Sequence, residues 1–170
     1  MELKDKIRVI EGFPKEGISY KDITTLLKDG EAYQKSINEC IEKVKDIHFD
    51  LIVAPEARGF LIGAPIAYSM GKGFVPVRKA GKLPYETLDY EYELEYGTDV
   101  LQMHKDGIKK GQKVLVTDDL LATGGTIISV IKMVEKLGGE VVGILFLMEL
   151  EFLKGRERLE GYRVESVVKY

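Results

Sequence analysis

Apolar residues recur along the chain in two alternating patterns, one with helical spacing and one made of short continuous runs. Over residues 32–47 they fall three and four positions apart, which predicts an amphipathic helix. Apolar stretches at 59–70 and 124–137 predict two more helices, the second ended by Gly138-Gly139. The short runs predict buried strands at residues 50–55, 73–78, 113–117, 140–147 and 164–168.

The order of these elements, strand then helix then strand, indicates the fold class. Continuous apolar strands are typical of a parallel sheet that helices cover on both faces. The sequence therefore predicts an α/β fold with a central, mostly parallel sheet. Ligands bind such sheets at the carboxyl ends of the strands, so we expect the functional residues in the turns at 55–59, 78–82 and 118–126.

Residues 82–100 interrupt this pattern. Four tyrosines are interleaved there with acidic residues, and such alternation predicts extended strands, for example a hairpin. A long insertion at the ligand end of a sheet is often a mobile lid. An edge hairpin used for packing or for a dimer contact is the alternative interpretation.

The segment 114–126 carries the most chemical information. An apolar strand runs into two carboxylates and then into a turn of small residues that opens a helix. Glycine backbone and the N–H groups of a helix N-terminus bind phosphate, and the carboxylates can accept hydrogen bonds from a vicinal diol. A helix cap explains one such residue but not the whole run. We therefore predict a ribose 5-phosphate site formed by Asp118, Asp119, Ala122, Thr123, Gly124, Gly125 and Thr126.

Composition excludes several other classes of protein. The 170 residues suit a single domain, and 25 Lys and Arg against 28 Asp and Glu give a net charge of −3, which disfavours nucleic-acid binding. The single cysteine excludes an intramolecular disulfide and a multi-cysteine zinc site. No apolar run reaches the roughly 20 residues of a membrane span, and no secretory signal is apparent. We expect a cytoplasmic chain with no membrane or nucleic-acid partner.

Two levels of family resemblance follow from these motifs. The run 114–126 resembles the phosphoribosyl diphosphate (PRPP) motif of the type I phosphoribosyltransferases. Further segments, in the expected order over nearly the whole chain, resemble the adenine phosphoribosyltransferase family in its short bacterial form. They are residues 13–24, 55–60, 78–84, 94–97 and 153–159.

The resemblance implies both an architecture and a reaction. It implies one type I phosphoribosyltransferase domain over residues 1–170, with a base-binding hood at 1–30 and a mobile lid at 82–100. The implied reaction belongs to purine salvage and converts adenine and PRPP to AMP and pyrophosphate in a homodimer. Mg²⁺ is the implied cofactor, bound mainly through substrate oxygens and water.

The same resemblance places adenine at Ser19, Tyr20 and Lys21. Tyr20 supplies an aromatic face on which a purine can stack, although a core aromatic is the alternative. Main-chain groups around Ser19 and Lys21 are expected to bond the edge of the base. Ser19 departs from the apolar residue expected there, and recognition through the main chain would make that change unimportant.

Four cations and two lid residues complete the expected site. A guanidinium at Arg58 can hold the leaving pyrophosphate bidentately, and Arg78, Lys79 and Lys82 form a basic turn that can add to it. Ordinary surface charges are the alternative for all four. The resemblance makes Glu95 the proton-transfer residue and Tyr96 a residue that closes over the pyrophosphate, so Glu95, Arg58 and Tyr96 are the catalytic candidates.

Two other functions stay open at this point. The acceptor base could be hypoxanthine, guanine or xanthine, because residues 161–166 faintly resemble xanthine phosphoribosyltransferases. A PRPP-sensing regulator of transcription is the alternative outside the enzymes. The motif begins by Phe13, which leaves no space for a DNA-binding domain in front of it.

Overall fold

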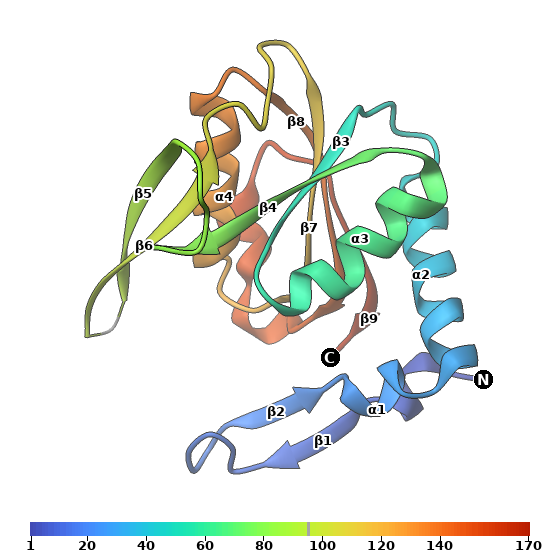
Figure 1. Cartoon of the computed structure of the whole chain (residues 1–170). Helices are drawn as coiled ribbons and strands as arrows, with labels where there is room; N and C mark the ends of the chain where they lie inside the picture. Colours follow the sequence, from blue (N-terminus) through green and yellow to red (C-terminus); the bar gives the residue numbers. More distant parts are fainter. Residues whose placement is uncertain (95) are drawn as a thin grey trace.

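A seven-stranded sheet runs through the computed structural model, which describes residues 1–94 and 96–170 (Figure 1). Its strands are β3 (Leu51–Pro55), β4 (Gly73–Lys79), β5 (Thr87–Leu94), β6 (Gly97–His104), β7 (Lys113–Leu121), β8 (Glu140–Glu149) and β9 (Val164–Lys169). Their spatial order is β5-β6-β4-β3-β7-β8-β9. The strands from β4 to β9 in that order pair in parallel, and β5 and β6 are antiparallel. The predicted α/β fold is confirmed.

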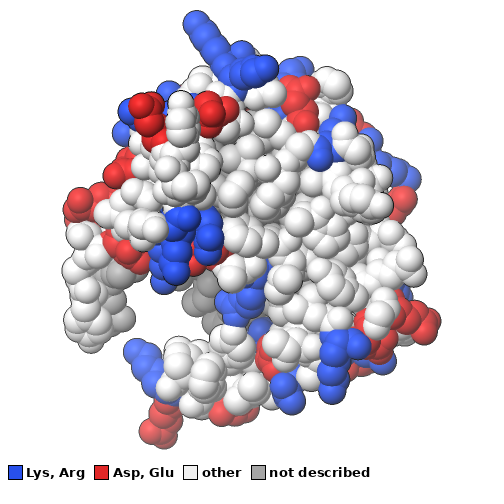
Figure 2. All heavy atoms as spheres, in the orientation of Figure 1, with Lys and Arg blue, Asp and Glu red and all other residues white. Residues whose placement is uncertain are grey.

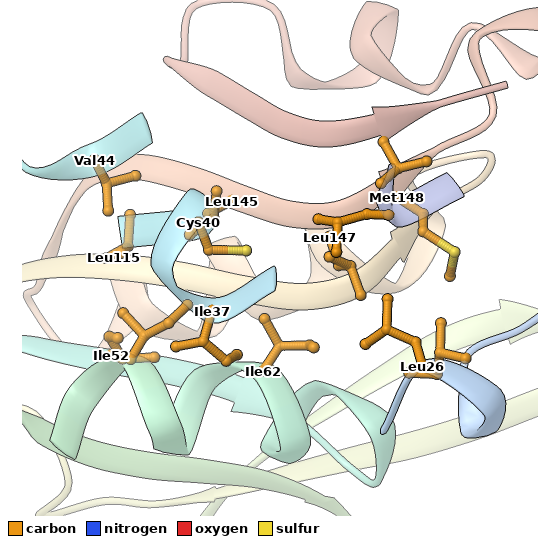
Figure 3. Close-up of a cluster of buried hydrophobic side chains, with 14 of the residues drawn as sticks. Leu26, Ile37, Cys40, Val44, Ile52, Ile62, Leu115, Leu145, Leu147 and Met148 are labelled. Atoms are coloured by element: carbon orange, nitrogen blue, oxygen red, sulfur yellow. The ribbon is translucent and has the colours of Figure 1, made fainter. Parts of the chain in front are cut away.

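Three long helices cover the two faces of this sheet. They are α2 (Gly30–Val44), α3 (Arg58–Met70) and α4 (Gly125–Lys136). Successive strand residues point to opposite faces, so Leu115 packs with α2 and α3 while its neighbour Val116 packs with α4. Figure 3 shows the first of these layers, where Cys40 and Ile62 meet side chains of the sheet. Burial on both faces explains why the strands are continuously apolar.

Two boundaries differ from the predictions in a way that matters for function. The strands predicted at 113–117 and 140–147 extend to Leu121 and Glu149, because Asp118 pairs with Phe146 and Leu121 pairs with Glu149. Asp118 and Asp119 therefore lie on β7 and not in the turn after it. Helix α2 covers 30–44 rather than 32–47, since the Asp29 side chain caps it by accepting a hydrogen bond from the backbone of Ala32.

The first 30 residues form a separate small layer. Their elements are η1 (Leu3–Lys6), β1 (Arg8–Glu11), β2 (Ser19–Asp22) and the short helix α1 (Thr24–Leu27). Within the described residues β1 and β2 pair only with each other, and Figure 1 shows them below the main sheet. Buried Leu3, Ile7, Ile23 and Leu26 join the layer to the core under α2 and α3. We call residues 1–30 the hood.

The segment 82–100 forms most of the antiparallel β5–β6 hairpin, as its alternating pattern predicts. The hairpin joins the main sheet where β6 pairs with the end of β4, Arg78 opposite Gln102. Its role as a lid stays a prediction, and Glu95 lies outside the described residues. In the part of the chain that is described, no helix is long and apolar enough to cross a membrane.

Candidate active site

The site lies at the carboxyl ends of β3 and β7, the two central parallel strands. From β3 the chain passes through α3 to β4 on one side, and from β7 it passes through α4 to β8 on the other side. Neighbouring strands whose connections leave in opposite directions open a crevice at their carboxyl ends. Figure 2 shows a hollow in this face of the molecule, between the hood and the β5–β6 hairpin, with Lys and Arg side chains at its rim.

A cavity of about 190 Å³ lies in this crevice. Arg58, Phe146 and residues 118–127 line it, so the structure gathers all seven predicted phosphoribosyl-binding residues around one space. Sites for complete small-molecule ligands usually measure about 300–1,000 Å³. The cavity therefore suits a sugar phosphate, and a base attached to that sugar would extend outwards toward the hood.

The loop 122–126 has the backbone of an anion site. Gly124 adopts φ +89°, which strongly favours glycine, and the next residue begins α4. The unpaired N–H groups and the dipole of this helix end favour a phosphate. The side chains of Thr123 and Thr126 are exposed here, so their hydroxyls are free to reach the same ligand.

Arg58 connects the phosphoribosyl cavity to the hood. Its Nε lies 2.9 Å from Oδ2 of Asp119, a residue that is only 5% exposed. This contact is an ion pair without hydrogen-bond alignment, so the buried Oδ2 keeps its lone pairs free for a ligand. On its other side the guanidinium donates a hydrogen bond to the hydroxyl of Tyr20. One cation from the first turn of α3 thus touches both halves of the site.

Asp118 is held against the first turn of α3. Its Oδ1 accepts a 2.8 Å hydrogen bond from the backbone N–H of Asp119. A Cβ at Gly59 would lie 2.9 Å from that same oxygen, so only glycine allows the helix to approach the carboxylate this closely. Burial, and then the negative charge of Asp119, raise the pKa of Asp118 well above its usual value.

The three adenine candidates are arranged differently from one another. The Tyr20 ring packs edge-on against Phe13 at 5.2 Å and points toward Arg58. Ser19 donates a 3.1 Å hydrogen bond to Glu11 and accepts a 2.9 Å bond from Lys21. Since strand side chains alternate, the polar pair lies on the other side of β2 from Tyr20. Only their main-chain groups remain available to a base beside Tyr20.

The basic turn lies at the same edge of the sheet but outside the phosphoribosyl cavity. Arg78 Nε is 3.3 Å from Oε1 of Glu56, and the same oxygen accepts a 2.7 Å bond from the backbone of Lys79. The side chains of Lys79 and Lys82 are exposed. Glu56 was not predicted as a site residue, although it lies within the turn 55–59 that the strand pattern indicated.

The two lid candidates are not brought to the cavity. Tyr96 is 88% exposed and does not line it, and Glu95 lies outside the described residues. Sequence reasoning also missed Gly155 and Arg158, which contact the back of the loop at Gly124 and Gly125. They follow the loop by about 30 residues, and no local pattern marks them as its neighbours.

A phosphate-binding helix N-terminus that follows two carboxylates, on this sheet, defines the class of type I phosphoribosyltransferases. Residues 19–168 match the family model of the phosphoribosyl transferase domain. The adenine phosphoribosyltransferase of Alkaliphilus oremlandii is 65% identical over 170 residues, which cover 100% of this chain and 99% of that protein. This chain belongs to the adenine phosphoribosyltransferase family.

Solved structures agree with this assignment. The crystal structure of adenine phosphoribosyltransferase from Thermoanaerobacter pseudethanolicus is similar with a TM-score of 0.96 and 59% identity, covering 99% of this chain and 98% of that one. The Saccharomyces cerevisiae enzyme, solved in complex with an imino-altritol bisphosphate and adenine, has a TM-score of 0.90 and 39% identity. That match covers 96% of this chain and 95% of the yeast chain.

The raised pKa of Asp118 predicts a pH-dependent effect on stability. Because the carboxyl pKa is higher in the folded than in the unfolded chain, Asp118 loses stabilising free energy as pH rises from about 4 through its folded pKa. Asp118→Asn removes this loss and keeps the oxygen that accepts the Asp119 N–H. We therefore expect its free energy of unfolding to exceed that of the unsubstituted chain at pH 7 and to converge with it near pH 4.

Urea denaturation followed by circular dichroism at pH 4, 5.5 and 7 measures this difference. Asp50→Asn is the matched control, since it replaces another carboxylate that accepts a backbone N–H, from Lys113, in an exposed position. A stability gap for Asp118→Asn that is the same at every pH would contradict the raised pKa.

Proposed function

We propose that this chain transfers the 5-phosphoribosyl group of PRPP to adenine, giving AMP and pyrophosphate, and thereby serves purine salvage. The observation that carries the proposal is the single cavity in which a phosphate-binding loop, two carboxylates and Arg58 meet. The names of full-length relatives and the adenine in the yeast complex support adenine as the base. Tyr20, hydrogen-bonded to Arg58, supports a base site in the hood.

The phosphoribosyl group is held by two kinds of contact in this proposal. The 5-phosphate binds the N–H groups and hydroxyls of residues 122–126 at the start of α4. The two ribose hydroxyls donate to Asp118 and Asp119, whose free oxygen faces the same cavity. The phosphate does not react, so its binding energy can be used to fix the position of C1 relative to the base.

The base enters on the hood side of the cavity. Adenine stacks on the Tyr20 ring, and main-chain groups of β2 near Ser19 and Lys21 bond its edge, since the side chains of both residues are engaged with one another. Arg58 is then available to the diphosphate, because its bond to Tyr20 and its ion pair with Asp119 leave further guanidinium N–H groups.

The reaction exchanges one bond at C1 for another. The N9–C1 bond forms, the bond from C1 to the diphosphate oxygen breaks, and pyrophosphate leaves with the electron pair. A transition state with oxocarbenium character is expected, by analogy with glycoside cleavage. Arg58, with Arg78, Lys79 and Lys82, offsets the charge on the leaving group. Glu95 takes the proton that adenine loses from N9, and closure of Tyr96 over the diphosphate excludes water.

Mg²⁺ fits this donor set as a partner of the substrate. Within the described residues no three His, Cys, Asp or Glu side chains converge as a metal cage. Asp118 and Asp119 offer carboxylate oxygens beside a cavity that would contain sugar and diphosphate oxygens. A magnesium ion usually keeps several waters and takes only one or two protein carboxylates together with substrate phosphates. When bound, it would neutralise charge on the diphosphate.

We also propose that the chain is a cytoplasmic homodimer. Helix α3 exposes large apolar side chains on its outer face, among them Leu61, which is 40% exposed, and Tyr68, which is 89% exposed. Apolar side chains of this size at the surface of a helix favour burial against a second protein surface. The relatives that support the function match this chain over its full length, so the same face is present throughout the match.

Base specificity is the first test of the proposal. We expect rapid pyrophosphate release from PRPP and Mg²⁺ with adenine, and little or none with hypoxanthine, guanine, xanthine or orotate. Release is measured with a coupled pyrophosphatase and phosphate assay. Asp119→Asn, prepared in the same way, serves as the control for contaminating host enzyme, since loss of its contact to Arg58 and to the ribose should abolish most turnover.

Preference for another base would keep the phosphoribosyl half of the proposal and contradict the adenine assignment. Silence with every base, despite measurable PRPP binding, would favour a PRPP-sensing protein over an enzyme.

The role of Glu95 gives a second test. Glu95→Gln keeps the shape of the side chain but removes its ability to accept the N9 proton. We expect kcat to fall by about 100-fold, the usual scale of a general base, with little change in either KM. Glu93→Gln, two residues earlier on the exposed β5 strand, is the control and should retain activity. An unchanged kcat in Glu95→Gln would reduce this residue to one of several surface acids.

A further inference from the structure

A buried ion pair joins the end of β8 to the segment that follows it. Glu149, only 3% exposed, receives two parallel hydrogen bonds from Arg156, Nε to Oε2 at 2.8 Å and Nη2 to Oε1 at 2.9 Å. Ser166 on β9 donates a further 2.6 Å bond to Oε1. The remaining nitrogen of the guanidinium, Nη1, donates a 2.9 Å bond to the carbonyl of Val164.

This network is strong for its position. Burial alone would raise the pKa of Glu149, but the hydrogen bonds from Arg156 and Ser166 outweigh that effect and lower it. The carboxylate therefore stays charged and holds the guanidinium in one orientation. A single Arg thus fixes the path of the chain between η2 (Glu151–Leu153) and η3 (Gly155–Leu159) relative to two strands of the sheet.

The residue that this pair immobilises is the one that touches the phosphate loop. Gly155 directly precedes Arg156, and a Cβ on it would lie 2.5 Å from the carbonyl oxygen of Ala122 and 2.8 Å from a methyl of Leu121. Its own carbonyl lies 3.1 Å from the position a Cβ would take at Gly124. Backbone therefore packs directly on backbone behind the loop.

The segment approaches the loop in a conformation that needs support. Lys154, at the junction of η2 and η3, adopts φ +54°, and it is the one residue other than glycine with positive φ in the described part of the chain. Such a backbone costs free energy and persists where the surroundings impose it. The bonds from Arg156, two residues later, are the contacts that can impose it.

We propose that the Glu149–Arg156 pair is a positioning device for the 5-phosphate. It presses Gly155 against Ala122 and Gly124, and so holds the loop with its N–H groups directed at the ligand. The pair touches neither substrate nor reacting atoms. This inference rests on the proposed function, because it assumes that the loop binds the phosphate of ribose 5-phosphate, PRPP and AMP.

Gly155→Ala tests the contact without disturbing the ion pair. Gly155 has no positive φ, so alanine is allowed by its backbone, and the only new feature is a methyl group that displaces the loop. Gly30→Ala is the matched control, since a Cβ there meets nothing within 4 Å. Arg156→Lys is the second variant, which keeps the charge but loses the two-pronged bond to Glu149.

We measure the Kd for ribose 5-phosphate and for AMP by calorimetry, and KM for PRPP and for adenine separately. Displacement of the loop by about 1 Å should weaken ribose 5-phosphate and AMP binding, and raise KM for PRPP, by roughly 10- to 100-fold in both variants. KM for adenine should stay within about twofold, because the hood does not contact Gly155. Gly30→Ala should match the unsubstituted chain.

Equal ribose 5-phosphate affinity in the unsubstituted chain, Gly155→Ala and Arg156→Lys would overturn the inference and leave the proposed function intact. Equal increases in both KM values would also overturn it, since they would indicate a general loss of structure. An unsubstituted chain that binds neither ribose 5-phosphate nor AMP would instead contradict the proposed function itself, and with it the inference.

Discussion

Two adjacent carboxylates at the end of β7 determine how the rest of the site is built. Asp118 and Asp119 repel each other and lose hydration on burial, so the fold must compensate them. Arg58 pairs with Asp119, the Asp119 N–H bonds Asp118, and Gly59 leaves space for the carboxylate. Two of these compensations come from the first turn of α3, so the packing of that helix on the sheet and the electrostatics of the site depend on the same contact.

The two halves of the site differ in how firmly they are held. The phosphate loop is enclosed by β7, α4 and the backbone of Gly155. The hood hairpin pairs with no strand of the main sheet, and its side-chain links to the body include Tyr20 with Arg58 and Lys21 over the ring of Tyr170 at 4.5 Å. An isolated two-stranded hairpin has little stability of its own. This contrast suits the proposed reaction, in which a fixed phosphoribosyl group meets a base that must enter and leave.

The sequence predicted what local patterns determine. Apolar runs indicate strands and helices, and the run from Asp118 to Thr126 combines its chemistry within nine consecutive positions, so both the sheet and the phosphate loop were accessible. What it could not predict depends on distant pairing. β7 extends through the aspartates because β8 lies beside it, Glu56 pairs with Arg78 from a neighbouring strand, and Gly155 reaches the loop only through Arg156. Gly59 shows the same limit, since its reason is a carboxylate about 60 residues away.

The central claim is that one cavity binds a ribose through its diol and its 5-phosphate together. Calorimetric titration with AMP, 2′-deoxy-AMP and adenosine tests it most directly, because the three ligands share the base and differ only in the groups assigned to the aspartates and the loop. The account predicts that loss of either the 2′-hydroxyl or the phosphate weakens binding by about tenfold or more, since each loss leaves charged or oriented groups without a partner. Equal affinity for all three ligands would contradict it.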